Sequence, residues 1–395
     1  MKISFIQPSR NNLKYLKWSY DSIRKNQGNH EVEICIADDF SNDGTWEWCQ
    51  EMLEKDPNFK AIRNEGPTRV GHTILYDRLI NEVATKEIGI IFHADMYLCP
   101  GALDSIESYI KPKTIVSLTR IEPPLHPEGP EKILMNFGIE PEDFPEESFL
   151  GWFTEKRRQV KGKITSGVFA PWAFYISDFQ EIGGHDKLFA PQSKEDSDIF
   201  NRFLLNGVDF VQTWEGMVYH MTCRGSRYNP NLTTVGKESV EWLEQNERSS
   251  RNFIRKWGHF VKHDAFMLPI VPPKYNVGIV IHKANLELIR TLEPWCDKLY
   301  IEDEMQVLFA YYYDQENKNT QYDLNKRIFD LTYVQPDTDI LVEIHKDTFN
   351  QQDFFIIQQL SEILQSQGEK GIFEIGNLTV KIDQLNQFQN NLIKL

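Results

Sequence analysis

The sequence has few cysteines and no long apolar run. Its five cysteines are odd in number and form no CxxC pair, so they indicate neither a disulfide framework nor a zinc site. No stretch approaches the roughly 18 apolar residues of a membrane span, and the first apolar run is too short for a signal peptide. We therefore expect reduced thiols, no transmembrane segment and a cytoplasmic protein.

Positive charge is also scarce. Lys and Arg number 43 against 58 Asp and Glu, which gives a net charge of -15. A surplus of this sign disfavours contact with a phosphate backbone, so no nucleic-acid partner is expected. A nucleotide diphosphate is still compatible with an acidic site, because a bound divalent cation can neutralise it.

The length and composition indicate a globular chain with more than one domain. Of 395 residues, 41% are hydrophobic and 26% are charged, and a chain this long exceeds what one core usually organises. A Pro-containing stretch at 266–274 separates two regions of alternating strand and helix patterns. We expect a domain at 1–265, a linker at 266–274 and a smaller α/β domain at 275–395, and find no internal repeat.

Short apolar runs alternate with helical patterns in the N-terminal region. Strands are expected near 3–7, 32–37, 59–63 and 88–92, with helices between them. This order predicts an α/β fold with a mainly parallel, three-layer sheet. Ligands bind beyond the carboxyl ends of such strands, where Asp38, Asp39 and Asp95 fall. The two acidic clusters should therefore meet in one crevice.

Residues 38–45 read Asp-Asp-Phe-Ser-Asn-Asp-Gly-Thr. This segment resembles the Asp-Asp-Gly-Ser-x-Asp-Gly-Thr segment of family 2 glycosyltransferases, which have the GT-A fold. The resemblance implies that Asp38 and Asp39 bind a nucleotide-sugar donor. Asp39 would contact the base, which favours UDP. The structural alternative is a solvated turn that caps the next helix.

His93-Ala94-Asp95 stands where GT-A enzymes keep an Asp-x-Asp motif. There the last Asp holds a divalent cation that bridges the donor phosphates, so the resemblance implies that Asp95 holds Mn²⁺ or Mg²⁺. His93 replaces the first Asp and could ligate the cation, touch the donor or only pack. A helix cap is the structural alternative for Asp95.

Gly183-Gly184 is followed by residues 195–203, Glu-Asp-Ser-Asp-Ile-Phe-Asn-Arg-Phe. Together they resemble the catalytic block of β-1,4-galactosyltransferase-like enzymes. The resemblance implies that Asp196 is the general base for the acceptor hydroxyl. Glu195 and Asp198 would orient the acceptor or support the loop. A carboxylate base and one displacement imply inversion, whereas the alternative is a charged helix start.

Four further side chains and one basic loop are candidates with structural alternatives. The same enzymes carry Met-x-x-His after the acidic block, which implies His220 and Met217 as cation ligands; a core histidine is the alternative. Arg69 could contact the donor pyrophosphate or lie on the surface. Trp172 could stack on an acceptor sugar or pack in the core. A basic loop with Arg224, Arg227 and Tyr228 could close over the diphosphate or form a surface turn.

The sequence thus predicts a metal-dependent, inverting glycosyltransferase that acts on a glycan or another hydroxyl acceptor. Two alternatives stay open. One is a non-catalytic nucleotide-sugar or glycan-binding module of the same fold, which His93 favours. The other is a sugar-phosphate nucleotidyltransferase, which the lack of glycine after the first strand disfavours. Dimerisation and acceptor docking are the roles considered for residues 275–395.

Overall fold

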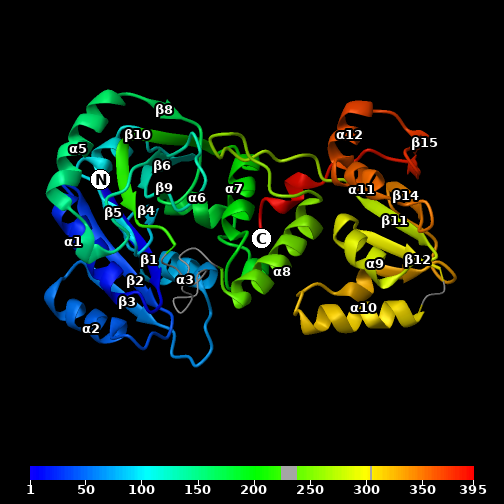
Figure 1. Ribbon diagram of the computed structural model, residues 1–395, viewed down its shortest axis with the longest axis horizontal. Coiled ribbons are helices and arrows are strands. Elements are labelled where there is room, and N and C mark those ends of the chain that lie inside the picture. The colour runs from blue at the N-terminus through cyan, green and yellow to red at the C-terminus, as the bar shows by residue number, and fades with distance from the viewer. Residues whose placement is uncertain (224–237, 303–304) are drawn as a thin grey trace. The chain divides into compact units, whose positions relative to one another are not determined.

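The structure, a computed structural model, describes residues 1–223, 238–302 and 305–395 (Figure 1). The chain forms two compact units. The first comprises Met1–Glu244, His263–Pro269 and Lys394–Leu395, and the second comprises Gln245–Lys262 and Ile270–Ile393. The domain bounds expected from the sequence, 1–265 and 275–395, stay a prediction. Within the described ranges, no helix is long and apolar enough to cross a membrane.

A mixed sheet forms the centre of the first unit. Its strands are β1 (Lys2–Ser9), β2 (Glu31–Asp38), β3 (Phe59–Arg63), β4 (Ile88–Ile91), β5 (Met96–Leu98), β6 (Thr114–Glu122), β7 (Ile133–Leu134), β8 (Ile164–Thr165), β9 (Trp172–Tyr175) and β10 (Asp209–His220). The main order is β3-β2-β1-β4-β9-β6-β10-β5. The first four strands are parallel, as the sequence predicts, whereas β9 is antiparallel to β4 and β6.

Helices connect and cover these strands. They are α1 (Leu13–Asn26), α2 (Thr45–Lys55), α3 (His72–Arg78), α4 (Ala102–Glu107), α5 (Glu146–Gln159), α6 (Ile176–Glu181), α7 (Glu195–Leu205) and α8 (Val240–Trp257), which enters the second unit at Gln245. α1 shows why they form: Leu16 and Ile23 recur at helical spacing and are fully buried. All four residues of β4 are buried, which is typical of a strand covered on both faces.

The second unit has a sheet of its own. Its strands are β11 (Val277–His282), β12 (Lys298–Ile301), β13 (Ile328–Asp330), β14 (Ile340–His345), β15 (Gly371–Ile375) and β16 (Leu378–Ile382). Its further helices are α9 (Leu286–Leu292), α10 (Met305–Asn317), α11 (Gln351–Gln358) and α12 (Leu360–Gln367). The strand order is β13-β12-β11-β14-β16-β15. This confirms a second α/β sheet domain.

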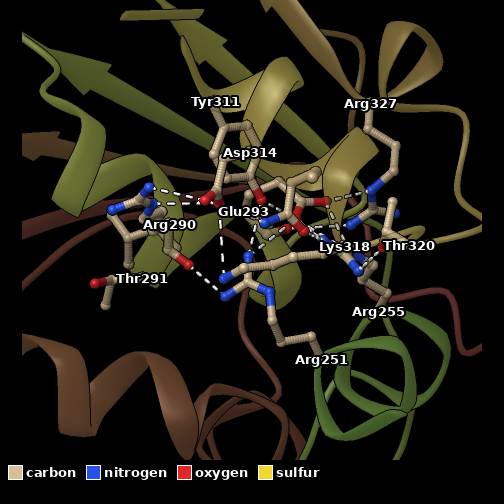
Figure 2. Close-up of polar contacts among 12 residues, drawn as sticks. Arg251, Arg255, Arg290, Thr291, Glu293, Tyr311, Asp314, Lys318, Thr320 and Arg327 are labelled. Carbon is tan, nitrogen blue, oxygen red and sulfur yellow. Dashed lines mark hydrogen bonds and ion pairs between the residues drawn. The ribbon is translucent and has the colours of Figure 1, made fainter. Parts of the chain in front are cut away.

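A buried carboxylate organises one side of the second unit (Figure 2). Glu293 is fully buried, and its carboxylate accepts hydrogen bonds from Arg255, Arg327 and Tyr311. Burial raises the pKa of Glu293, but the charges of Arg255 and Arg327 outweigh it and hold the pKa well below its usual range. The cluster joins α8, the turn after α9, α10 and the start of β13, so it ties these elements to one point.

Candidate active site

A cluster of three potential cation ligands lies where β4 and β10 end. His93 and Asp95 follow β4, and His220 is the last residue of β10. β5 pairs antiparallel with β10, which places Met96 opposite His220. One ligand atom of each of the three side chains lies within 4.8 Å of the others, and Asp95 Oδ1 is 3.5 Å from His220 Nε2. Two imidazoles and one carboxylate suit a divalent cation of borderline softness.

Burial and charge oppose each other in this cluster. Burial lowers the pKa of His93 to about 4, so this imidazole is neutral at pH 7. Burial also lowers the pKa of His220, but Asp95 and Glu122 outweigh it and raise the value to about 9. Burial raises the pKa of Asp95, whereas His220 outweighs this and lowers it. The carboxylates therefore favour a positive charge at this position.

Glu122 is a site residue that the sequence analysis missed. Its Oε1 lies 2.8 Å from Nδ1 of His220, and its Oε2 lies 3.3 Å from Nζ of Lys132. A carboxylate on one ring nitrogen orients the imidazole and leaves Nε2 for a cation. No motif marks Glu122, because its position depends on the parallel pairing of β6 with β10.

The acidic block begins α7, close to the expected position. Lys194, just before the helix, has a left-handed φ of 70°. Oε1 of Glu195 lies 2.6 Å from Nε2 of His72, a second residue that no sequence motif indicates. Asp196 is half-buried, and burial followed by the charge of Glu195 raises the pKa of Asp196 to about 6. A carboxylate with such a pKa can accept a proton at neutral pH.

The rest of the acidic block is structural. Asp198 and Arg202 are fully buried, with Oδ2 of Asp198 2.8 Å from Nε of Arg202. Arg202 also donates hydrogen bonds to the carbonyl oxygens of Ile182 and Gly184. These bonds attach α7 to the Gly-Gly turn. Of the two roles expected for Asp198, support of the loop fits these contacts, whereas orienting an acceptor does not, because its carboxylate has no exposed surface.

The cluster of potential cation ligands and the acidic block line the same cavity. Asp95 and His220 line it together with Glu195 and Asp196. Its volume is about 560 Å³, within the usual size range of small-molecule sites. Other residues of its wall include Asp39, Arg69, His93, Arg120, Glu122 and Lys132.

The two carboxylates after β2 have different environments. Asp38 is fully buried, with Oδ2 3.2 Å from Nε of Arg63, and it does not line the cavity. The expectation that Asp38 binds the donor is therefore corrected. Asp39 does line the cavity and accepts the backbone N–H groups of Val70 and Gly71 at 3.0 and 2.9 Å. It holds the following loop at the cavity wall.

This loop meets the segment that leads into α7. Nη2 of Arg69 lies 2.7 Å from Oε1 of Gln192. Gly71 has a φ of 82°, and a Cβ there would lie 2.2 Å from the carbonyl oxygen of Pro191. Only glycine permits this approach. Arg69 lines the cavity, and its contact with a donor pyrophosphate stays a prediction.

Two further expectations are corrected by burial. Trp172 is fully buried in β9, and its ring packs on Phe174 with centroids 4.5 Å apart, so it presents no face to a sugar. Met217 is also fully buried. In an extended strand, residues three apart point to opposite faces, so Met217 points away from the cluster that contains His220. The loop with Arg224, Arg227 and Tyr228 lies outside the described residues.

The sequence was compared with known proteins. Residues 4–183 match the family model "Glycosyl transferase family 2". A search of curated proteins found no match. The matched segment contains Asp39, His93, Asp95 and Glu122, and it ends before Asp196 and His220.

Several solved structures resemble part of the chain. The crystal structure of GalNAc-T7 with UDP, GalNAc and Mn²⁺ is 16% identical with a TM-score of 0.46, over 64% of this chain and 48% of that one. The mannosyltransferase PcManGT from Pyrobaculum calidifontis, with GDP-Man and Mn²⁺, is 16% identical with a TM-score of 0.41, over 62% and 61%. TarS of S. aureus is 17% identical with a TM-score of 0.39, over 56% and 37%. The match thus spans about half of GalNAc-T7. The family model thus marks residues 4–183, a little under half of the chain, as similar to family 2 glycosyltransferases, and this segment contains most of the mixed sheet of the first unit.

Proposed function

We propose that this chain transfers a sugar from a nucleotide-sugar, with UDP as the favoured nucleotide, to a hydroxyl of a glycan or another acceptor. One observation carries the proposal: Asp95, His220 and Asp196 line the same cavity. A cation-binding cluster and a proton acceptor can therefore act on one bound donor. Asp39 favours UDP because it lies at the strand end where the resemblance places the base contact.

Asp95, His220 and His93 would hold the divalent cation. The donor set fits it, because the ligand atoms converge and Glu122 orients His220. Two imidazoles favour Mn²⁺ over Mg²⁺, which prefers oxygen ligands. When bound, such a cation stabilises the negative charge of the departing diphosphate.

Asp196 would take the proton of the acceptor hydroxyl. Its raised pKa of about 6 leaves it ionised at neutral pH, yet basic enough to accept a proton. Glu195 would help to place it through the hydrogen bond to His72. Attack of the acceptor in a single displacement inverts the anomeric carbon. Arg69 would lie beside the diphosphate as a charge-assisted donor.

A panel of UDP-, GDP- and TDP-sugars, with Mn²⁺ present and with a chelator, tests this function. We expect nucleotide release from at least one donor, larger for UDP-sugars, and loss of release with the chelator. Tight nucleotide binding without release from any donor, across a broad set of acceptors, would instead support a non-catalytic binding module.

The role of Glu122 can be tested by cation binding alone. We expect Glu122→Gln to weaken Mn²⁺ binding about 10- to 100-fold, because the charge that orients His220 is removed. Isothermal titration calorimetry measures this without a turnover assay. Glu131→Gln is the matched control, since Glu131 pairs with Arg120 at 3.5 Å and makes no contact with His220 that the structure records. Equal affinities of the two variants would contradict the assignment.

A further inference from the structure

The second unit repeats part of the fold of the first. In the first unit β3-β2-β1-β4-β9 are neighbours, and in the second β13-β12-β11-β14-β16 are neighbours. In each set the first four strands are parallel and the fifth is antiparallel to the fourth. The two units share this strand order although the sequence contains no recognisable repeat.

The register of the strands agrees as well. The ladder of β1 with β4 starts at Ile3 with Ile88, and that of β11 with β14 starts at Val277 with Ile340. The remaining ladders match in the same alignment. Phe5 pairs with Ile34, which pairs with Phe59, and the corresponding row in the second unit is Ile279, Leu299 and Ile328. Ile88 pairs with Tyr175, and the corresponding pair is Ile340 and Ile382. One alignment therefore superposes all four ladders.

This alignment pairs two segments that share the pattern His-x-Asp. His93-Ala94-Asp95 follows the first residue of β4 at the same spacing as His345-Lys346-Asp347 follows the first residue of β14. The second unit thus has His-x-Asp at the position of the first unit's cation cluster. Among its described residues, however, no strand corresponds to β10 and no helix to α7. It therefore lacks counterparts of His220 and Asp196.

The carboxyl edge of this second sheet carries histidine and lysine. His282 ends β11 and pairs in the ladder with His345, which ends β14. Their rings are stacked, with centroids 4.4 Å apart and an interplanar angle of 14°. The chain passes from β11 to β12 on one side of β11, whereas β14 lies on the other side, so this is where the strand order reverses. Open α/β sheets bind ligands at this point.

Two lysines distinguish this edge from its counterpart. By the alignment, Lys283 stands where the first unit has Ser9, and Lys346 stands where it has Ala94. Ser9 and Ala94 both line the first unit's cavity. The second unit therefore has two lysines at positions whose counterparts line the cavity of the first unit.

Two acidic side chains near this edge, among the residues that the structure describes, are engaged in weak pairs. Nζ of Lys283 lies 2.9 Å from Asp347, and both side chains are largely exposed, at 75% and 65%. Nδ1 of His282 lies 2.9 Å from Oε1 of exposed Glu302. Exposed pairs of this kind contribute little, so a multiply charged anion can displace them.

We propose that the carboxyl edge of the second sheet is a separate binding site for a nucleoside diphosphate. His282, Lys283, His345 and Lys346 bind its phosphates without a divalent cation. The site binds and does not catalyse, because it has no counterpart of the proposed base. The proposal does not depend on transfer by the first unit.

Calorimetry of the full chain with UDP in EDTA tests the proposal. We expect binding by the wild type and by His220→Ala, in which the first cluster lacks a ligand. The double variant Lys283→Ala/Lys346→Ala should bind at least about tenfold more weakly, because two charge-assisted contacts are lost. Pyrophosphate should compete with UDP, because the phosphates are the recognised groups.

The control is Lys326→Ala/Lys381→Ala. Both lysines pair with nearby aspartates, and they lie toward the opposite edge of the same sheet, before β13 and opposite Leu341 of β14. This control should bind like the wild type. The proposal is overturned if the wild type does not bind UDP in EDTA, if both double variants bind equally, or if pyrophosphate does not compete. Binding that appears only with Mn²⁺ would also overturn it.

Discussion

Asp196→Asn should lower the rate of sugar transfer about 100- to 10,000-fold, the usual contribution of a general base. The amide cannot accept the acceptor's proton, but it keeps the shape of the side chain. Cation and donor binding should change little, because Asp95 and His220 are untouched. Steady-state kinetics with the best donor of the panel, together with calorimetric binding of Mn²⁺ and nucleotide, separates the two effects.

Ser197→Ala is the matched control for this variant, since Ser197 is the next residue in the first turn of α7 and is also half-buried. It should retain nearly full activity. Equal turnover of Asp196→Asn and the wild type would remove the proposed base.

The pH dependence of the transfer rate should follow the ionisation of the Asp196 carboxyl group. Burial and Glu195 raise the pKa of Asp196 to about 6. A base must be ionised to act, so the rate at saturating cation should fall about tenfold per pH unit below 6 and level off above it. The residual activity of Asp196→Asn should not show this fall in rate below pH 6. If the fall persists unchanged in the variant, another group causes it.

Glu293→Gln should lower the free energy of unfolding of the second unit by about 3–5 kcal/mol, which is typical of breaking a buried ion pair. The substitution leaves Arg255 and Arg327 buried without their carboxylate partner. Urea denaturation followed by circular dichroism measures the shift. Glu247→Gln removes an exposed pair with Lys318 and should cost less than about 1 kcal/mol.

The depressed pKa of Glu293 gives the expected pH dependence of this effect. The folded pKa lies below the ordinary value of 4.5, so the stabilisation is complete above that value and is lost as the pH falls below it. The difference between wild type and Glu293→Gln should therefore shrink in acid. A difference that is constant down to pH 3 would contradict the charge-based explanation.

Local sequence patterns predicted the parts of the site that depend on strand ends. The apolar run before His93 and Asp95 predicted a strand, and the sheet topology then placed Asp95 at its edge. The role of Asp196 follows from the resemblance of residues 195–203 to a catalytic block and stays a prediction, and the structure places these acids at the start of α7. These patterns act over a few residues, so they can be read without knowing the tertiary structure.

Such local patterns could not predict which side chains are buried or which distant strands pair. Asp38 and Asp39 are adjacent, yet only Asp39 reaches the cavity, because successive residues point in different directions. Asp198 reads like Asp196 in the sequence but is buried against Arg202. Glu122 belongs to no motif and reaches His220 only because β6 pairs with β10. The repeat in the second unit is likewise visible in strand register and not in composition.

The most direct test of the account is an anomalous-difference map from crystals grown with Mn²⁺ and UDP. We expect a manganese peak bound by Asp95 and His220, with the diphosphate in the cavity that Asp196 lines. A manganese ion held elsewhere, or a diphosphate outside that cavity, would contradict it.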